Sequence, residues 1–168
     1  MKRRQFVFGI ATASALAAQS TTNPIAARSS GGMNGAGLKS VLVRDAMWAY
    51  RDKGDGPPAL FLHSFLLNSA LWLDQLNGLS SIRRCIAPDL RGWGQSEPVT
   101  DNPLVYAQYA RDILTFLDAI GIDEPVDIVG MSATAFIAGL VYDLAPDRVA
   151  SLTLISGNFA LGLSLIHI

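Results

Sequence analysis

Apolar and polar positions follow two alternating patterns along most of this chain. Short continuous apolar runs, such as residues 59–62 and 126–129, are typical of strands buried on both faces of a sheet. Longer segments between them place apolar residues three and four positions apart, as on one face of a helix. The predicted strands are 40–43, 47–50, 59–62, 84–87, 126–129 and 149–155, and the predicted helices are 69–79, 103–120 and 133–144.

The ends of these elements carry matching signals. In the second helix Asn102 is suited to the N-cap, Pro103 to the first turn, where a missing N–H is harmless, and Gly121 to the C-terminal end. A turn-forming stretch at residues 52–58 separates two of the strands. The alternation of strands and helices predicts an α/β fold, a mostly parallel sheet with helices on both faces.

The first 27 residues have the features of an export signal. A basic start at residues 2–4 precedes an apolar stretch at 6–18 and small residues suited to a signal peptidase. The Arg3-Arg4 pair resembles the twin-arginine signal, so we expect the twin-arginine machinery to export the precursor to the periplasm or the medium. An uncleaved N-terminal anchor is the alternative. Residues 28–38 are interpreted as a flexible linker.

Composition excludes several classes of protein. The 168 residues are 50% hydrophobic and 16% charged, with a mean hydropathy of +0.31, which excludes a disordered chain. The 13 basic and 14 acidic residues nearly cancel, which argues against a nucleic-acid partner. One cysteine, Cys85, and two histidines exclude a disulfide framework and a histidine-rich metal cage, and we interpret Cys85 as a buried apolar residue.

Candidate chemistry lies in three loops that follow predicted strands, where an open α/β sheet binds its ligands. Residues 130–134 place Ser132 between a strand and a helix, at a turn that can expose its hydroxyl. A serine that only caps the following helix is the alternative. The other two loops are 63–65 and 89–96. We interpret Asp89 and Arg91 as stabilising the last of them.

Together these loops, in this order, resemble the α/β-hydrolase family over about residues 41–159, and most closely its esterase, lactonase and cofactor-free haloperoxidase-like branch. The resemblance implies that Ser132 is a nucleophile and that the backbone N–H groups of Phe65 and Ala133 form an oxyanion hole. It also implies a structural role for His63 in positioning its loop, and places Ser64 and Met131 beside the bound substrate. No cofactor or metal is implied.

Two residues depart from the family pattern. Ser64 and Thr134 stand where the family usually has glycine, and we expect a side chain there to crowd the backbone. Ser64 is the more serious departure, since it can reshape residues 63–65, the oxyanion loop, which carry the predicted donor Phe65. A haloalkane-dehalogenase interpretation is disfavoured, because that branch has an aspartate at the position of Ser132.

The resemblance also implies that the catalytic acid and histidine lie beyond residue 168. After Asp147 the chain has no acidic residue, and its only later histidine, His167, lies in an apolar tail. We therefore expect residues 39–160 to be the N-terminal part of a C-terminally truncated hydrolase domain. Residues 161–168 are interpreted as a non-native tail, with a natural apolar ending as the alternative.

The predicted function is that of an exported serine hydrolase that acts on a small carboxylic ester or lactone through an acyl-enzyme. A cofactor-free haloperoxidase or perhydrolase, with peroxide in place of water, and a non-catalytic binding protein of the same fold are the alternatives. For the 168 residues alone we expect no efficient turnover. We also expect poor folding, because the last strand would present an unpaired edge.

Overall fold

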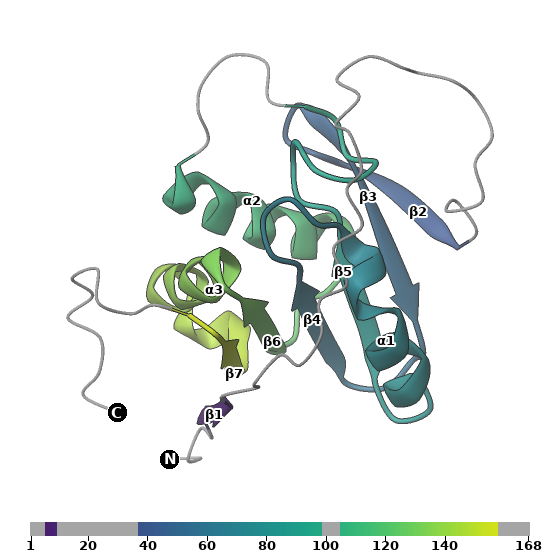
Figure 1. The fold of residues 1–168 in the computed structure, drawn as a ribbon, viewed down its shortest axis with the longest axis vertical. Coiled ribbons are helices and arrows are strands. Elements are labelled where there is room, and N and C mark those ends of the chain that lie inside the picture. Colours follow the sequence, from purple (N-terminus) through teal and green to yellow (C-terminus); the bar gives the residue numbers. More distant parts are fainter. Residues whose placement is uncertain (1–5, 10–36, 99–104, 158–168) are drawn as a thin grey trace.

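The computed structural model describes residues 6–9, 37–98 and 105–157, and these residues build one seven-stranded sheet (Figure 1). The strands are β1 (Phe6–Gly9), β2 (Leu38–Val43), β3 (Ala46–Lys53), β4 (Pro58–Leu62), β5 (Arg84–Pro88), β6 (Val126–Met131) and β7 (Val149–Ile155). Their order across the sheet is β1-β7-β6-β4-β5-β3-β2. The β2–β3 and β3–β5 pairs are antiparallel and the rest are parallel. The prediction of a mostly parallel sheet is confirmed.

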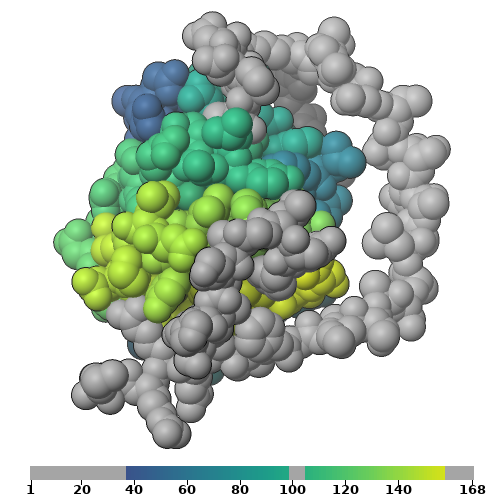
Figure 2. Space-filling view, turned by 90° about the vertical axis from the view of Figure 1, so that its left-hand side faces the viewer, coloured from purple at the N-terminus to yellow at the C-terminus, as the bar shows by residue number. Residues whose placement is uncertain are grey.

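Helices cover both faces of the sheet. A 3₁₀ turn, Ser69–Trp72, leads into α1 (Leu73–Leu79) on one face. The other face carries α2 (Tyr106–Ala119) and α3 (Ala133–Leu144), which lie side by side in Figure 1 and in the space-filling view of Figure 2. A second 3₁₀ turn, Pro146–Arg148, precedes β7.

The central strand β4 shows how the apolar runs fill both layers. Leu60 and Leu62 pack into the larger core cluster, with side chains of α2 and α3. Ala59 and Phe61 belong to the smaller cluster, with Trp72 and Leu76 on the α1 side. Because side chains alternate along a strand, a run that must face two helical layers is apolar at every position.

The end of one strand and the start of one helix lie three residues from their predicted positions. Strand β3 continues through Lys53, so Asp52 and Lys53 belong to the sheet and not to the predicted turn; Asp52 pairs there with Ile86. The Asp52 carboxylate accepts two hydrogen bonds from the Arg84 guanidinium, which stabilises the extra length. Helix α2 begins at Tyr106, and the predicted cap residues at positions 102 and 103 lie outside the described residues.

The prediction of an unpaired last strand was wrong. Strand β1 lies parallel to β7, with Phe6 opposite Leu152 and Gly9 opposite Ile155. This strand falls inside the predicted export signal. The rest of that signal, the linker up to residue 36 and the tail 161–168 lie outside the described residues. Strand β2 begins at Leu38, the last residue assigned to the linker.

Candidate active site

A strained turn places Ser132 between β6 and α3. Its backbone has φ 57° and ψ −121°, a combination that side chains normally avoid. The Ser132 N–H donates to the carbonyl of Ile155 over 2.9 Å, which holds the turn against the end of β7. Ser132 is solvent-exposed, and its side chain makes no capping hydrogen bond to α3. The helix-cap alternative therefore lacks the contact that defines it.

Gly130 occupies the most tightly packed position of this turn. A Cβ on Gly130 would lie 2.6 Å from the carbonyl oxygen of Thr134 and 2.8 Å from the Cα of Ala135, so only glycine fits. Thr134 lies in α3 with its side chain fully buried, and its φ is not positive. The expected crowding at Thr134 is therefore not found, and the close approach between strand and helix occurs at Gly130.

His63 begins the loop after β4 and is fully buried. Its Nε2 accepts a hydrogen bond from the N–H of Leu90 over 2.9 Å, which leaves the proton on Nδ1, 2.8 Å from the carbonyl of Ser64. Burial lowers the pKa of His63 more than the Ser64 carbonyl and the Asp89 carboxylate raise it, so the neutral ring is favoured. The ring joins two loops and has no free nitrogen with which to act as a base.

The residues that follow His63 form a tight turn. The N–H of Leu67 donates to the carbonyl of Ser64 over 3.1 Å, and Leu66 between them has φ 70°. Positive φ at the third residue is typical of a type II turn, a position that normally takes glycine. Ser64 has no positive φ, so its side chain does not distort the loop as expected. The strain lies at Leu66, whose side chain is 83% exposed.

Aromatic side chains hold Phe65 in place within that turn. Its ring stacks on Trp93 at 5.5 Å and lies 5.6 Å from Tyr109 and 5.9 Å from Tyr106. Aromatic pairs at such distances add stabilisation beyond the area they bury. The side chain of Phe65 is therefore anchored against α2 and the loop after β5.

The two predicted oxyanion donors follow strands that end at the same edge of the sheet. Strands β4 and β6 are parallel neighbours, and their last pair joins Leu62 to Gly130. Phe65 follows the first of these strands closely and Ala133 the second. Within the described residues neither amide donates a hydrogen bond to the protein. Both N–H groups are thus available to a ligand oxygen at the carboxyl edge beside Ser132.

Asp89, after β5, binds the backbone of two segments near the site. It is 2% exposed; its Oδ1 accepts from the N–H of Ser69 over 2.6 Å and its Oδ2 from the N–H of Gln95 over 2.8 Å. A Cβ on Gly94 would lie 2.1 Å from Oδ2, so the loop closes on this carboxylate only through glycine. Both oxygens are engaged by backbone donors, which is a structural role.

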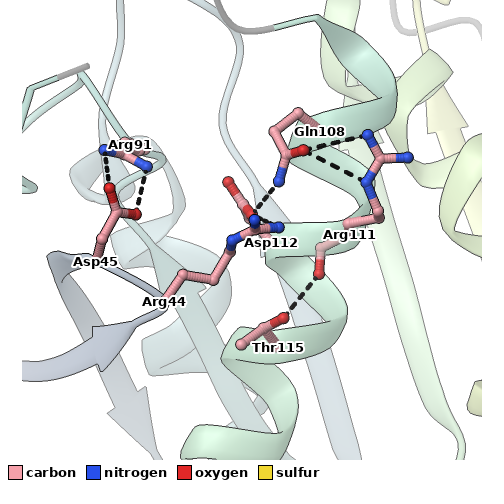
Figure 3. A network of polar contacts seen from close by, with 7 residues as sticks. All are labelled: Arg44, Asp45, Arg91, Gln108, Arg111, Asp112 and Thr115. Atoms are coloured by element: carbon pink, nitrogen blue, oxygen red, sulfur yellow. Dashed lines mark hydrogen bonds and ion pairs between the residues drawn. The ribbon is translucent and has the colours of Figure 1, made fainter. Parts of the chain in front are cut away.

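A polar network ties the same loop to the rest of the domain (Figure 3). Arg91 makes two hydrogen bonds to the carboxylate of Asp45, of 2.8 and 3.1 Å, and its carbonyl accepts from the hydroxyl of Tyr109. Next to it, Asp112 in α2 is 1% exposed, accepts from Gln108 over 2.7 Å and lies 3.5 Å from Arg44. Burial raises the pKa of Asp112 above its usual value.

The other candidate residues are buried or outside the described part. The Met131 side chain packs, partly buried, against the cluster on the α1 side of the sheet. Cys85 is fully buried, and burial raises the pKa of its thiol. The described residues include no group of three metal-ligating side chains. In the same part of the chain no helix is long and apolar enough to cross a membrane. His167 lies outside it.

Sequence reasoning missed two residues of this site. It did not find the left-handed backbone of Leu66, for which a leucine gives no signal. It treated the side chain of Thr134 only as a source of crowding, because the contact of its hydroxyl with Leu62, 72 residues earlier, gives no signal in the sequence.

Comparisons with known proteins agree with this architecture. The family profile described as "alpha/beta hydrolase fold" matches residues 57–167. Epoxide hydrolase 2 of Siraitia grosvenorii is 39% identical over 108 residues, 63% of this chain and 34% of that protein. A haloalkane dehalogenase of Mesorhizobium japonicum is 33% identical over 116 residues, 67% of this chain and 36% of that protein.

A solved structure points in the same direction. The thermophilic esterase from Thermogutta terrifontis superimposes with a TM-score of 0.67 at 26% sequence identity, covering 73% of this chain and 46% of that one. The chain spans about a third of the length of the curated relatives that it matches.

Proposed function

The chain belongs to the α/β-hydrolase fold family, and from that membership we propose that its parent protein is an exported serine hydrolase for a small carboxylic ester or lactone. One observation carries the proposal: Ser132 is exposed on a strained turn, with its side chain unused by the helix that it precedes. Strain that has no structural use is typical of a functional residue.

The proposed reaction is acyl transfer. The Ser132 Oγ attacks the carbonyl carbon, a new C–O bond forms, and the hydroxyl proton passes to a base supplied by the rest of the parent protein. The negative charge that develops on the carbonyl oxygen is stabilised by the N–H groups of Phe65 and Ala133. The bond between the carbonyl carbon and the alcohol oxygen then breaks, and that oxygen takes the proton from the base; the alcohol leaves, or in a lactone stays attached to the acyl chain. Water, giving its proton to the same base, attacks the acyl-enzyme, and the bond to the Ser132 Oγ breaks as Oγ takes that proton back.

The nature of the nucleophile distinguishes this reaction from those named for the two curated relatives. Opening an epoxide or displacing a halide requires attack on a saturated carbon, and a serine hydroxyl would form an ether there. Water does not hydrolyse an ether under mild conditions, so the enzyme would stop after one turnover. Attack by Ser132 on an acyl carbon forms an ester, which water cleaves. A serine at this turn therefore favours carboxylic esters and lactones.

Export remains part of the proposal on the sequence alone. The basic start, the apolar stretch and the arginine pair at positions 3 and 4 support it. Fusion of residues 1–36 to a reporter that is active only outside the cytoplasm tests it. The expected result is reporter activity that is lost when both arginines are replaced by lysine.

A fluorophosphonate probe tests the nucleophile in the full-length parent protein. We expect labelling that disappears in Ser132→Ala and persists in Ser156→Ala. Ser156 is a matched control, because it is also exposed, follows the neighbouring strand β7 and has φ 50°. Equal labelling of wild type and Ser132→Ala would remove Ser132 from the mechanism. No labelling of either protein would favour a binding protein.

A further inference from the structure

The hydroxyl of Thr134 lies between the two loops of the proposed site. The N–H of Met131 donates to its Oγ1 over 2.9 Å. The same oxygen lies 3.0 Å from the carbonyl oxygen of Leu62 and 2.9 Å from that of Met131. The side chain is fully buried. A hydroxyl has one proton, so it accepts from Met131 and donates to one of the two carbonyls at a time.

These contacts lie just past the last rung between β4 and β6. The final pair of that ladder joins Leu62 to Gly130. Backbone groups of successive strand residues point to opposite sides, and the N–H of Ser132 points to β7, where it meets Ile155. The N–H of Met131 therefore points toward β4, where the strand partner has ended. The Thr134 hydroxyl takes the place of that partner.

We propose that Thr134 is a positioning residue that holds the turn of Ser132 in register with the oxyanion loop. On one side its hydroxyl is bonded to the residue directly before Ser132. On the other it reaches the carbonyl of Leu62, the residue directly before His63. The inference rests on the proposed function and adds a residue to it. A glycine, the residue usual in this family at that position, could not make this connection.

The connection matters because the two loops share a reacting carbonyl. The carbon must meet the Oγ of Ser132 while the oxygen meets the N–H of Phe65. Displacing one loop relative to the other by 1 Å can lower the rate about 100-fold, since catalysis depends on this alignment. His63 also holds the loop that carries Phe65, through its bonds to Leu90 and Ser64.

The structure also accommodates the extra side chain at Thr134. The close approach between α3 and the strand falls at Gly130, where the nearest atoms to an added Cβ belong to the backbone of Thr134 and Ala135 and not to the Thr134 side chain. The backbone at Thr134 is helical and needs no glycine. Thr134 thus adds a hydroxyl without adding strain.

The test compares variants of the full-length protein by their reaction with a fluorophosphonate, separating the maximal rate of inactivation from the apparent affinity for the probe. Thr134→Val keeps the shape and removes the hydroxyl, and Thr134→Ser keeps the hydroxyl. Thr115→Val is the matched control, because the Thr115 hydroxyl bonds only a carbonyl of its own helix, that of Arg111, over 3.1 Å. Thermal unfolding is measured for each variant.

We expect Thr134→Val to lower the maximal rate about 10-fold to 100-fold with little change in affinity, because alignment and not binding is lost. Thr134→Ser restores most of the rate, and Thr115→Val leaves it unchanged. If Thr134→Val folds poorly, Thr134→Gly and Thr134→Ser repeat the comparison without the methyl group.

Two results would overturn the inference. One is a normal maximal rate in Thr134→Val, or in Thr134→Gly if that variant is needed, even if the melting temperature falls, which would mean a purely structural role. The other is an equal loss in Thr134→Ser and Thr134→Val. Both leave the proposed function intact as long as labelling depends on Ser132. Labelling that persists in Ser132→Ala overturns the proposed function itself.

Discussion

The two ends of the parallel strands differ in which residues adopt positive φ. Glycines do so at both ends, with Gly92 and Gly94 at the carboxyl end, but among the described residues those with side chains do so at the carboxyl end alone. Before β4, at the amino end, Gly54 has φ 84°, and a Cβ there would lie 2.1 Å from the carbonyl oxygen of Arg83. At the carboxyl end, Leu66 and Ser132 have φ 70° and 57° although both carry side chains. Within the described residues all four non-glycine positions with positive φ lie at turns of that end: Arg44, Leu66, Ser132 and Ser156.

This difference separates stability from function within one sheet. Where only a compact turn is needed, glycine removes the strain. Where a strained turn keeps a side chain, a functional use of that position is favoured, because strained positions cluster at functional sites. The carboxyl end is also where Ser132 and the predicted oxyanion donors, the N–H groups of Phe65 and Ala133, lie.

The largest effect on stability is expected at the amino end. Gly54→Ala should lower the free energy of unfolding by about 3 kcal/mol, because the new Cβ meets backbone oxygens that cannot move aside. Gly121→Ala is the control: its φ is 71° and a Cβ would meet nothing within 4 Å. That variant should lose only about 1 kcal/mol, the usual penalty of a left-handed alanine. Urea unfolding measures both, and equal losses would contradict the steric explanation.

At Ser132 the introduction of glycine, and not its removal, tests the strain. Ser132→Gly is expected to be about 1 kcal/mol more stable than Ser132→Ala, because glycine relieves the strain at φ 57° and alanine keeps it. Neither variant should react with a fluorophosphonate. Urea unfolding of the two proteins gives the difference directly. A glycine variant no more stable than the alanine variant would show that this turn stores no strain.

The two ends should also respond to acid in different pH windows. Burial lowers the pKa of His63, so the folded protein binds a proton there less readily than the unfolded chain. Stability from this group is therefore lost as the pH falls below 6.5, the usual histidine value, by about 1.4 kcal/mol per pH unit at most. Chemical unfolding between pH 7.5 and 5.5 tests this loss.

Asp52, at the amino end, belongs to a lower window. Burial raises its pKa, but the hydrogen bonds from Arg84 and Lys39 outweigh burial and lower it below 3.8. Its contribution is complete above pH 3.8 and is lost only as the pH falls further. Asp112, whose pKa is raised, has the opposite sign, because the folded protein binds a proton there more readily than the unfolded chain and gains stability as the pH falls. Asp112→Asn removes this gain, so that the loss from His63 is measured alone. A stability that is flat from pH 7.5 to 5.5 in Asp112→Asn would contradict the role of His63.

The smallest effect concerns Leu66. Leu66→Gly should raise the free energy of unfolding by about 0.5 kcal/mol, since the exposed side chain contributes little packing and its φ of 70° suits glycine. Leu67→Gly next to it, 44% exposed and without positive φ, should lose about 1 kcal/mol. Thermal unfolding of the pair is sufficient, and a loss in both variants would argue against strain at Leu66.

The layered fold could be predicted from the sequence because its signals are local. The runs 59–62 and 126–129 locate β4 and β6 to within one or two residues, since both strands face helices on each side. Strand β3 was predicted too short because Asp52 is typical of turns, and its partner Arg84 lies 32 residues away. A local sequence pattern does not reveal an ion pair between residues so far apart in the chain.

The site could be predicted only in part, for the same reason. The resemblance named Ser132, Phe65 and Ala133 from three short loops. The role of the Thr134 hydroxyl depends on a contact with Leu62, 72 residues earlier in the chain. The strain at Ser132 depends on its N–H reaching Ile155 on another strand. Such contacts exist only once the strands are side by side.

The most direct test of the central claim is the location of the acyl group. The full-length protein is mixed with an activated ester, stopped in acid and digested with trypsin, and the modified peptide is sequenced by mass spectrometry. Cleavage after Arg111 and Arg148 leaves Ser132 in one peptide, residues 112–148. We expect a single acyl group on Ser132, formed as fast as the first equivalent of alcohol is released. An acyl group on another residue, or none while the ester is consumed, would contradict the claim.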